Sequence, residues 1–411
     1  MKPWLHQIED SEKAYKILKE NAIVYLACEE RTGKSLTALL IAEKALVIKV
    51  LIVTKKGKPK EGWDELLQEF KHNKVYHVTT YHQLTKLKDM DWDLVILDES
   101  HNYIAAFPDH SKLWSVVKRY TTDKPIIYIS ATPNAQSLGQ LYGQFALSSW
   151  SPFHNYPTYK KWHAKYGNPY VKHLRGRKID MWDDVKDELV KAKTNHLFIT
   201  RTRQDLDFEH EPEDKLHWIE LTDTTKAIYN QILKKKVYTA EDGKIIEYDT
   251  KTKLRFGLHM LEGGTLKRSF PALNKKGNPV MSSVTYDTGN TEKIDYIKEQ
   301  WGDNNKVAIM YNYIREGQKL REHFEHAEIL QATTNAEGIS LMHIDHLIIY
   351  SQDFSTARHT QRRARQANKA RDSEIVVHFL LVEKGISEEV YNTVSLNKTN
   401  YVDMYFTGSK L

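Results

Sequence analysis

The first residues that could do chemistry form the tripeptide Gly33-Lys34-Ser35, which lies between the apolar run Ala22–Cys28 and the helical pattern Ser35–Ile48. This arrangement is typical of the end of the P-loop pattern G-x-x-x-x-G-K-[S/T], with Cys28 at the position of the first glycine. Backbone N–H groups at such a helix N-terminus cradle phosphate oxygens, Lys34 neutralises their charge, and the serine hydroxyl reaches Mg²⁺. The alternative is a lysine and a serine that open an ordinary helix. The loop residues predicted to bind ATP are Arg31, Thr32, Gly33, Lys34 and Ser35.

A pair of carboxylates forms the second candidate group. Asp98 and Glu99 directly follow the apolar run Leu94–Leu97. An aspartate at the end of a buried strand can hold Mg²⁺, together with Ser35, and an adjacent glutamate can act as the general base for water. A solvated acidic strand end is the alternative. Because the pair follows a P-loop pattern, the sequence predicts ATP hydrolysis with ATP and Mg²⁺ as cofactors.

The elements that position these residues alternate between buried strands and amphipathic helices, a pattern that predicts an α/β fold with parallel sheets. The alternation is interrupted and then returns, so we expect two lobes, at 1–212 and 213–411. An aromatic and basic accessory segment is expected at about 151–193, and an irregular insertion at about 237–290. The expected strands are Ala22–Cys28, Val50–Thr54, Leu94–Leu97, Pro125–Ser130, Val307–Met310, Glu328–Gln331, His346–Ser351 and Glu374–Leu381; the expected helices include Ser35–Ile48 and Trp63–Phe70.

Composition excludes several classes. Apolar residues make up 40% and charged residues 28% of the 411 residues, which excludes disordered and collagen-like chains. No run of about 18 apolar residues is present, and the N-terminus lacks the apolar core of a signal peptide. The single cysteine excludes an internal disulfide and a zinc site built on several thiolates. The histidine spacing fits no metal-ligand pattern, and the net charge of +6 slightly favours a polyanionic partner.

Several motifs together resemble helicase superfamily 2. Asp98-Glu99-Ser100-His101 is similar to a DEAD/DEAH box, and Ser130-Ala131-Thr132 to motif III. Within the superfamily the best resemblance is to Snf2-like motors of phage or bacterial type. The further motifs that carry the resemblance are Leu5-His6-Gln7 for the glutamine motif, Leu51–Lys55 with Trp63 for motif Ia, Thr79–Leu84 for motif Ib, Gly338–Leu341 for motif V, Phe354 with Gln361 for the W-N-P-x₄-Q pattern, and Gln361–Arg365 for motif VI.

The resemblance implies two RecA-like lobes in tandem and assigns roles to residues of this chain. Gln7 would read adenine, and the second lobe would add Gly338, Gln361 and Arg365 to the ATP site. Asn368 stands where motif VI usually has its second arginine. The arginine finger is therefore Arg365, Lys369 or Arg362, and we expect Arg365. The expected nucleic-acid contacts are Lys55, Lys56, Thr80, Thr333 and Thr334, and the expected coupling residues are His101, Ser130 and Thr132.

The aromatic residues of the accessory segment admit two interpretations. Tyr159, Trp162 and Tyr166 could stack on bases at a fork or junction. They could equally pack an accessory helical pair onto the first lobe, which is the commoner use of aromatic side chains.

The function that the resemblance implies is an ATP-dependent DNA helicase or translocase acting on duplex, forked or branched DNA in replication, recombination or repair. Fork unwinding and branch migration are the specialisations considered. The alternatives are the motor subunit of a restriction or nuclease system, an RNA helicase, and an ATP-gated nucleic-acid clamp that does not step. We expect a monomer without zinc or membrane contact, in the bacterial cytoplasm or a phage-infected cell.

Overall fold

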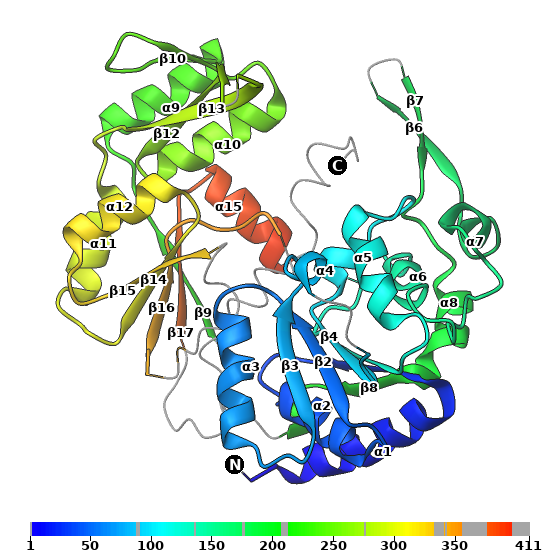
Figure 1. The fold of residues 1–411 in the computed structure, drawn as a ribbon. Coiled ribbons are helices and arrows are strands. Elements are labelled where there is room, and N and C mark those ends of the chain that lie inside the picture. The colour runs from blue at the N-terminus through cyan, green and yellow to red at the C-terminus, as the bar shows by residue number, and fades with distance from the viewer. Residues whose placement is uncertain are drawn as a thin grey trace. The chain divides into compact units, whose positions relative to one another are not determined.

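The structure is a computed structural model that describes residues 2–87, 91–134, 137–174, 177–206, 213–274, 277–332, 341, 343–355 and 376–396. The chain divides into two compact units, Met1–Phe208 and Glu209–Leu411 (Figure 1). Five residues predicted for the site, namely Thr333, Thr334, Gly338, Gln361 and Arg365, lie outside the described residues. Within the described ranges, no helix is both long enough and apolar enough to span a membrane.

The first unit is built on a six-stranded sheet of order β3-β2-β4-β5-β1-β8, in which every printed pairing is parallel. Its central strands are buried on both faces, as expected of a parallel sheet covered by helices. The strands predicted in this half are present, with bounds that differ by a residue or two. The strands are β1 (Ile23–Cys28), β2 (Lys49–Thr54), β3 (Val75–Thr80), β4 (Leu94–Asp98), β5 (Ile126–Ile129) and β8 (Phe198–Arg201).

Helices cover the two faces of this sheet and form two separate cores (Figure 1). Alternate strand residues point to opposite faces, so Leu26 and Ile96 pack with Leu39 of α2, whereas Tyr25 and Leu97 belong to the core of the opposite face. The helices of the unit are α1 (Leu5–Asn21), α2 (Lys34–Lys44), α3 (Lys58–Glu69), α4 (His101–Ile104), α5 (Lys112–Thr121), α6 (Gln140–Phe145), α7 (Tyr159–Tyr166) and α8 (Asp187–Thr194), with short 3₁₀ turns at Leu84–Lys86, Asn195–Leu197 and Gln204–Leu206.

The accessory segment packs onto this unit through its aromatic side chains. Tyr159, Trp162 and Tyr166 are 1%, 0% and 3% exposed and join the same core as the sheet. Between α7 and α8 the chain forms an antiparallel hairpin, β6 (Tyr170–Leu174) and β7 (Arg177–Met181). The packing interpretation is therefore confirmed. Base stacking on these three residues is wrong, because their rings are already covered by protein.

The second unit contains a five-stranded parallel sheet of order β15-β14-β16-β17-β9. Four of its strands follow the predicted ranges, whereas β9 was not predicted because its exposed and half-buried residues give no apolar run. Both units are thus α/β with a parallel sheet, as the fold prediction requires. The strands are β9 (Glu213–Trp218), β14 (Val307–Tyr311), β15 (Glu328–Gln331), β16 (His346–Ile349) and β17 (Val376–Leu381); the helices are α9 (Asp223–Lys235), α10 (Lys251–Glu262), α11 (Glu292–Trp301), α12 (Ile314–His323) and α15 (Ile386–Val390), with a π-helical segment at Tyr391–Leu396.

The segment 237–290 is more regular than the sequence indicates. It forms the short hairpin β10 (Val237–Thr239) and β11 (Ile245–Glu247), helix α10, and the long hairpin β12 (Thr265–Leu273) and β13 (Pro279–Asp287). The expectation of irregular structure was wrong here. A two-stranded ribbon that is exposed on both faces lacks the periodic apolar signal on which strand prediction depends.

Three charged side chains are buried where this insertion meets the second sheet. Glu262, Lys293 and Glu316 are 2%, 2% and 0% exposed. Glu262 accepts hydrogen bonds from the backbone N–H groups of Ile386 and Ser387 at 2.6 and 3.0 Å. Burial raises the pKa of Glu316 to about 7 and lowers the pKa of Lys293. The Lys293 ammonium donates to the Tyr350 carbonyl at 2.8 Å and interacts electrostatically with both carboxylates inside a low-dielectric core.

Candidate functional site

The predicted phosphate loop, residues 29–33, runs from the end of β1 to the start of α2, at the carboxyl edge of the first sheet. Gly33 is the residue before the helix and has φ of 82°, and Arg31 also has a positive φ, of 67°. The Lys34 ammonium donates to the carbonyls of Cys28 and Glu29 at 2.8 and 2.7 Å, which use two of its three hydrogens. The first turn of α2 adds N–H groups that have no partner within the helix. The loop therefore gathers cationic and N–H donors, the set that a phosphate requires.

Cys28 stands where the P-loop pattern has its first glycine, and its side chain is accommodated in the sheet. The thiol is 5% exposed and donates to the Ile199 carbonyl on the neighbouring strand β8 at 3.5 Å. Burial raises the pKa of Cys28 to about 11, so the thiol stays protonated. The side chain therefore belongs to the sheet core and leaves the hollow of the loop to its backbone.

Two side chains of helix α1 form hydrogen bonds to the backbone of the phosphate loop. The Gln7 amide donates to the Gly33 carbonyl at 3.0 Å and accepts from the Trp4 N–H at 2.8 Å. His6 contacts the Thr32 carbonyl at 2.9 Å. A Cβ at Gly33 would lie 2.1 Å from Gln7 Nε2, so both the positive φ and the close approach of Gln7 require glycine here. The structure thus brings Gln7 to the loop, as the glutamine-motif prediction expects.

Thr32 and Ser35 take different positions in the loop. Thr32 is 3% exposed and its hydroxyl donates to the Glu29 carbonyl at 2.8 Å, so this side chain shapes the loop and only its backbone is available to a ligand. Ser35 is half-buried in the first turn of α2, and its hydroxyl makes no hydrogen bond within the described part of the chain.

Asp98 ends β4 and is held in place from two neighbouring elements. Its Oδ2 atom accepts from the Thr54 hydroxyl of β2 at 2.8 Å and from Trp63 Nε1 of α3 at 3.0 Å. The Tyr81 hydroxyl donates to its backbone carbonyl at 2.9 Å. Charge-assisted hydrogen bonds of this kind fix the orientation of a carboxylate. The supporting roles of Thr54 and Trp63 were not predicted, although both belong to the segment that resembles motif Ia.

Glu99 follows Asp98 in a strained backbone conformation, with φ of 49°. Its N–H donates to the Ile129 carbonyl at the end of β5, and its Oε2 lies 3.7 Å from His101 Nδ1. His101 is also within 3.0 Å of the Ser130 hydroxyl and 3.4 Å of the Thr132 hydroxyl. The structure therefore brings the three predicted coupling residues together, beside the predicted base. Left-handed non-glycine residues of this kind cluster at functional sites.

Gln144 of α6 is a second connection that sequence reasoning missed. Its Oε1 accepts from the Ser100 hydroxyl at 2.7 Å and from the Tyr25 hydroxyl at 2.9 Å, and its Nε2 donates to the Pro133 carbonyl at 2.8 Å. The side chain is completely buried. Gln144 thereby joins the loop after β4 to the loop after β5, and nothing in its local sequence signals that role.

A partly buried ion pair supports the start of the phosphate loop. Arg201, which ends β8 beside Cys28, donates to both carboxylate oxygens of Asp10 at 2.8 to 3.2 Å. The next loop continues the support, because the Arg203 N–H donates to the Glu29 carboxylate at 2.7 Å. Bidentate pairs are geometrically specific. This brace ties α1, β8 and the loop together, and it was not predicted.

The residues predicted to contact nucleic acid separate into two groups. Lys55 is half-buried and Lys56 exposed, directly after β2. Thr80 ends β3 but is 2% exposed, and its hydroxyl donates to Gln83 at 3.2 Å. The prediction that the Thr80 side chain contacts a nucleic-acid strand is not supported, because its hydroxyl already donates a hydrogen bond to Gln83 within the protein.

The donor set fits Mg-ATP. An ammonium and N–H groups meet at the phosphate loop, and the oxygen ligands that Mg²⁺ prefers are available from Ser35 and Asp98. The topology explains their convergence. β1, β5 and β4 are neighbours in one parallel sheet, so the residues that follow them share one edge, where ligands of such sheets bind.

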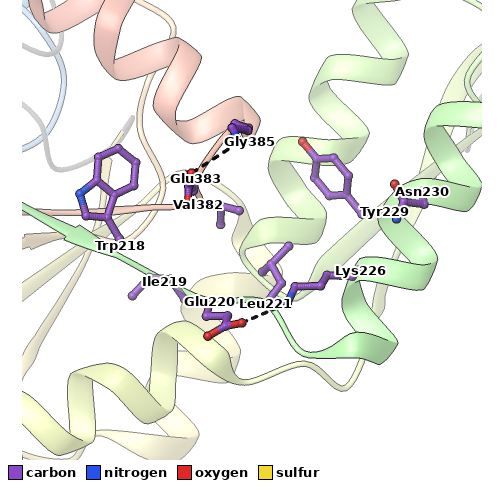
Figure 2. A pocket seen from close by; sticks show the side chains of 11 residues that line it. Trp218, Ile219, Glu220, Leu221, Lys226, Tyr229, Asn230, Val382, Glu383 and Gly385 are labelled. Carbon is purple, nitrogen blue, oxygen red and sulfur yellow. Dashed lines mark hydrogen bonds and ion pairs between the residues drawn. The ribbon is translucent and has the colours of Figure 1, made fainter.

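A pocket of about 610 Å³ lies in the second unit, at the carboxyl ends of β9 and β17. Figure 2 shows Trp218 on one side, Tyr229 of α9 on the other, and the Glu220–Lys226 ion pair of 3.2 Å between them. None of the described residues predicted to bind ATP lines this pocket.

Solved structures similar to the chain include the following two. The SWI2/SNF2 ATPase core domain of Sulfolobus solfataricus is 14% identical with a TM-score of 0.42, over 99% of this chain and 92% of that one. The Hef helicase domain of Pyrococcus furiosus is 13% identical with a TM-score of 0.48, over 95% and 97%. No curated protein sequence matches the chain. The family model of the SNF2-related domain matches residues 41–262, more than half of the chain. The protein is therefore an enzyme of the ATPase/helicase class, and the chain belongs to the SNF2-related domain family.

Proposed function

We propose that this protein is an ATP-dependent DNA translocase with helicase activity, which couples ATP hydrolysis to movement on duplex or branched DNA. One observation carries the proposal. The phosphate loop with Lys34 follows β1, Asp98 ends β4 and precedes Glu99, and Ser130 follows β5. These three strands are neighbours in one sheet. A phosphate clamp, a metal-binding carboxylate, a base and a coupling residue therefore share one edge. Membership of the SNF2-related family supports the assignment to nucleic acid.

Each residue of this edge has a role in the proposed reaction. Lys34 and the N–H groups of α2 would hold the β- and γ-phosphates, and Ser35 and Asp98 would hold Mg²⁺, which would supply positive charge to the phosphate oxygens. Glu99 orients the attacking water and accepts its proton. His101 lies within contact distance of Glu99 and of both hydroxyls after β5. The state of Glu99 can therefore be transmitted to the Ser130–Thr132 loop through one imidazole.

The second half of the ATP site rests on the sequence alone. We propose Arg365 as the arginine that stabilises charge on the transferred phosphoryl group, with Gln361 and Gly338 as further ATP contacts. Lys55 and Lys56 are proposed to contact phosphates of the DNA backbone, because a motor must bind independently of sequence; Thr333 and Thr334 are proposed on the same grounds. We further propose a monomer that acts in replication, recombination or repair, in the bacterial cytoplasm or a phage-infected cell.

The test compares ATP turnover of the full chain without nucleic acid and with single-stranded, duplex, forked and four-way DNA, with matched RNA controls. We expect duplex or branched DNA to stimulate turnover, and displacement of a triplex-forming strand to report movement. Lys34→Ala provides the inactive control. A turnover rate that DNA does not change would instead favour the ATP-gated clamp, and stimulation by RNA alone would favour an RNA helicase.

A further inference from the structure

The hairpin β12–β13 is the longest two-stranded ribbon among the described residues. Its strands, Thr265–Leu273 and Pro279–Asp287, pair antiparallel over nine positions and form a sheet of their own (Figure 1). Nine residues of strand span roughly 30 Å. The ribbon is therefore long enough for its outer half to reach well beyond the base that anchors it.

The base of the hairpin is held firmly in the second unit. Thr265 and Leu266 are completely buried, and Leu266 shares a core with residues of α9, α10 and α15. Asp287, opposite Thr265, accepts from Lys319 at 2.9 Å and lies 3.7 Å from Arg315. A buried start and a paired charge at the other strand fix the direction in which the ribbon leaves the unit.

The outer half exposes apolar side chains on both faces. Leu273 is 71% exposed and Met281 is 68% exposed, and the pairing register places them on one face. Val280, which is 40% exposed, lies on the other face, as does Val284, which is 44% exposed and stands opposite Arg268 in the inner half. A two-stranded ribbon has no second layer to cover either face. Exposed apolar groups gathered in this way indicate a binding surface.

The polar groups of the ribbon are suited to an anion. From Thr265 to Tyr286 the sequence contains no aspartate or glutamate. Lys267 is exposed, and Arg268 lies over the Phe270 ring at 5.2 Å. Exposed Ser269 and Ser283 stand opposite each other on the face of Lys267. Ammonium, guanidinium and hydroxyl donors without a competing carboxylate match the phosphate backbone of nucleic acid rather than a mixed-charge protein surface.

We propose that β12–β13 is a strand-separating wedge, with Lys267 and Arg268 on the phosphate backbone of duplex DNA and the exposed Leu273 and Met281 against unpaired bases at a strand junction. Apolar side chains placed between base steps unstack them, and cationic side chains nearby hold the backbone in position. This inference rests on the proposed DNA translocase function and adds to it the surface that separates the strands.

The test uses the full chain with the combined substitutions Leu273→Ser and Met281→Ser. The matched control is Ile245→Ser, which removes an apolar side chain that is 56% exposed on the separate hairpin β10–β11. Three readouts are compared: duplex-stimulated ATP turnover, unwinding of a forked duplex per ATP hydrolysed, and fluorescence of 2-aminopurine at the fork junction, which rises when the base unstacks. We expect the tip variant to lose unwinding by roughly tenfold and to lose the fluorescence rise, with turnover changed by less than about twofold.

Each other outcome overturns the wedge. Unwinding by the tip variant that equals Ile245→Ser would show that the tip does not separate strands, and would leave a protein or membrane partner as its use. An equal loss of duplex-stimulated turnover would assign the ribbon to gripping the duplex. If the wild-type chain shows no DNA-stimulated turnover, the proposed function itself fails. If it shows stimulated turnover without unwinding, the translocase stands and only the wedge is refuted.

Discussion

Removing the Thr54 hydroxyl tests the metal-binding role of Asp98 most directly. Thr54→Val keeps the branched shape of a residue that is completely buried and deletes the 2.8 Å hydrogen bond to Asp98 Oδ2. Trp63→Phe removes the second bond to the same oxygen and keeps an aromatic ring in the core. In both variants the carboxylate loses part of the support that orients it towards the metal.

The expected magnitude follows from the number of bonds lost. A hydrogen bond to a charged group contributes about 2 kcal/mol, or roughly 30-fold in an equilibrium constant. One bond to Oδ2 remains in either single variant, so we expect the Mg²⁺ concentration for half-maximal ATP turnover to rise by roughly tenfold. The double variant removes both bonds, and its effect should exceed that of either single change.

The assay is a Mg²⁺ titration of ATP turnover at saturating ATP, with thermal unfolding measured in parallel. Thr79→Val is the matched control, because Thr79 is 4% exposed at the end of the adjacent strand β3 and its hydroxyl makes no hydrogen bond within the described residues. If Thr54→Val and Trp63→Phe give the same Mg²⁺ midpoint as Thr79→Val, Asp98 does not hold the metal and the site assignment is refuted.

Four further substitutions test other parts of the structure. Lys34→Ala should abolish ATP turnover, since the phosphate clamp is lost, as measured by phosphate release. Glu99→Gln should retain ATP binding and block hydrolysis, as compared by nucleotide fluorescence and turnover. Gly33→Ala should weaken ATP binding and lower the melting temperature, because its Cβ would lie 2.1 Å from Gln7 Nε2 at a φ of 82°. Glu316→Gln should gain stability relative to wild type as pH rises from 5 to 8, as followed by thermal unfolding.

The direction of the Glu316 effect follows from linkage. The pKa of this carboxyl is about 7 in the folded chain against an ordinary value of 4.5. The folded state therefore holds the proton more tightly, and wild-type stability is lost as pH rises from about 4.5 through 7. Glutamine does not ionise, so the difference between the two proteins should change by about 3 kcal/mol over that window. A difference that is independent of pH would contradict the shifted pKa.

Each of the other three substitutions has an outcome that would contradict the reason given for it. A Lys34→Ala variant with near-normal turnover would disprove the phosphate-loop assignment. Rapid hydrolysis by Glu99→Gln would point to a different base. Combining Gln7→Ala with Gly33→Ala should recover the part of the stability lost to the clash, while the strain of an alanine at positive φ remains. If the double variant melts no higher than Gly33→Ala, the clash with Gln7 is not the cause of the lost stability.

The local parts of the site were determined by the sequence. A buried run, a G-K-S turn and a helical pattern specify the phosphate loop within 27 residues or so, because strand, turn and helix preferences act over short distances. The same holds for Asp98 and Glu99 after β4. The alternation of strands and helices likewise indicated the α/β class of both units.

The supporting contacts were decided by the tertiary structure. Thr54 and Asp98 are 44 residues apart, and Tyr25 and Gln144 are 119 residues apart. Such pairs meet only when strands take their places in the sheet, and the order β3-β2-β4-β5-β1-β8 is not encoded in any local pattern. The burial of Trp162 and the exposed ribbon of Leu273 illustrate the same limit. An aromatic or aliphatic residue has the same local sequence signal whether a core covers it or not, and only the packing of the folded chain decides which.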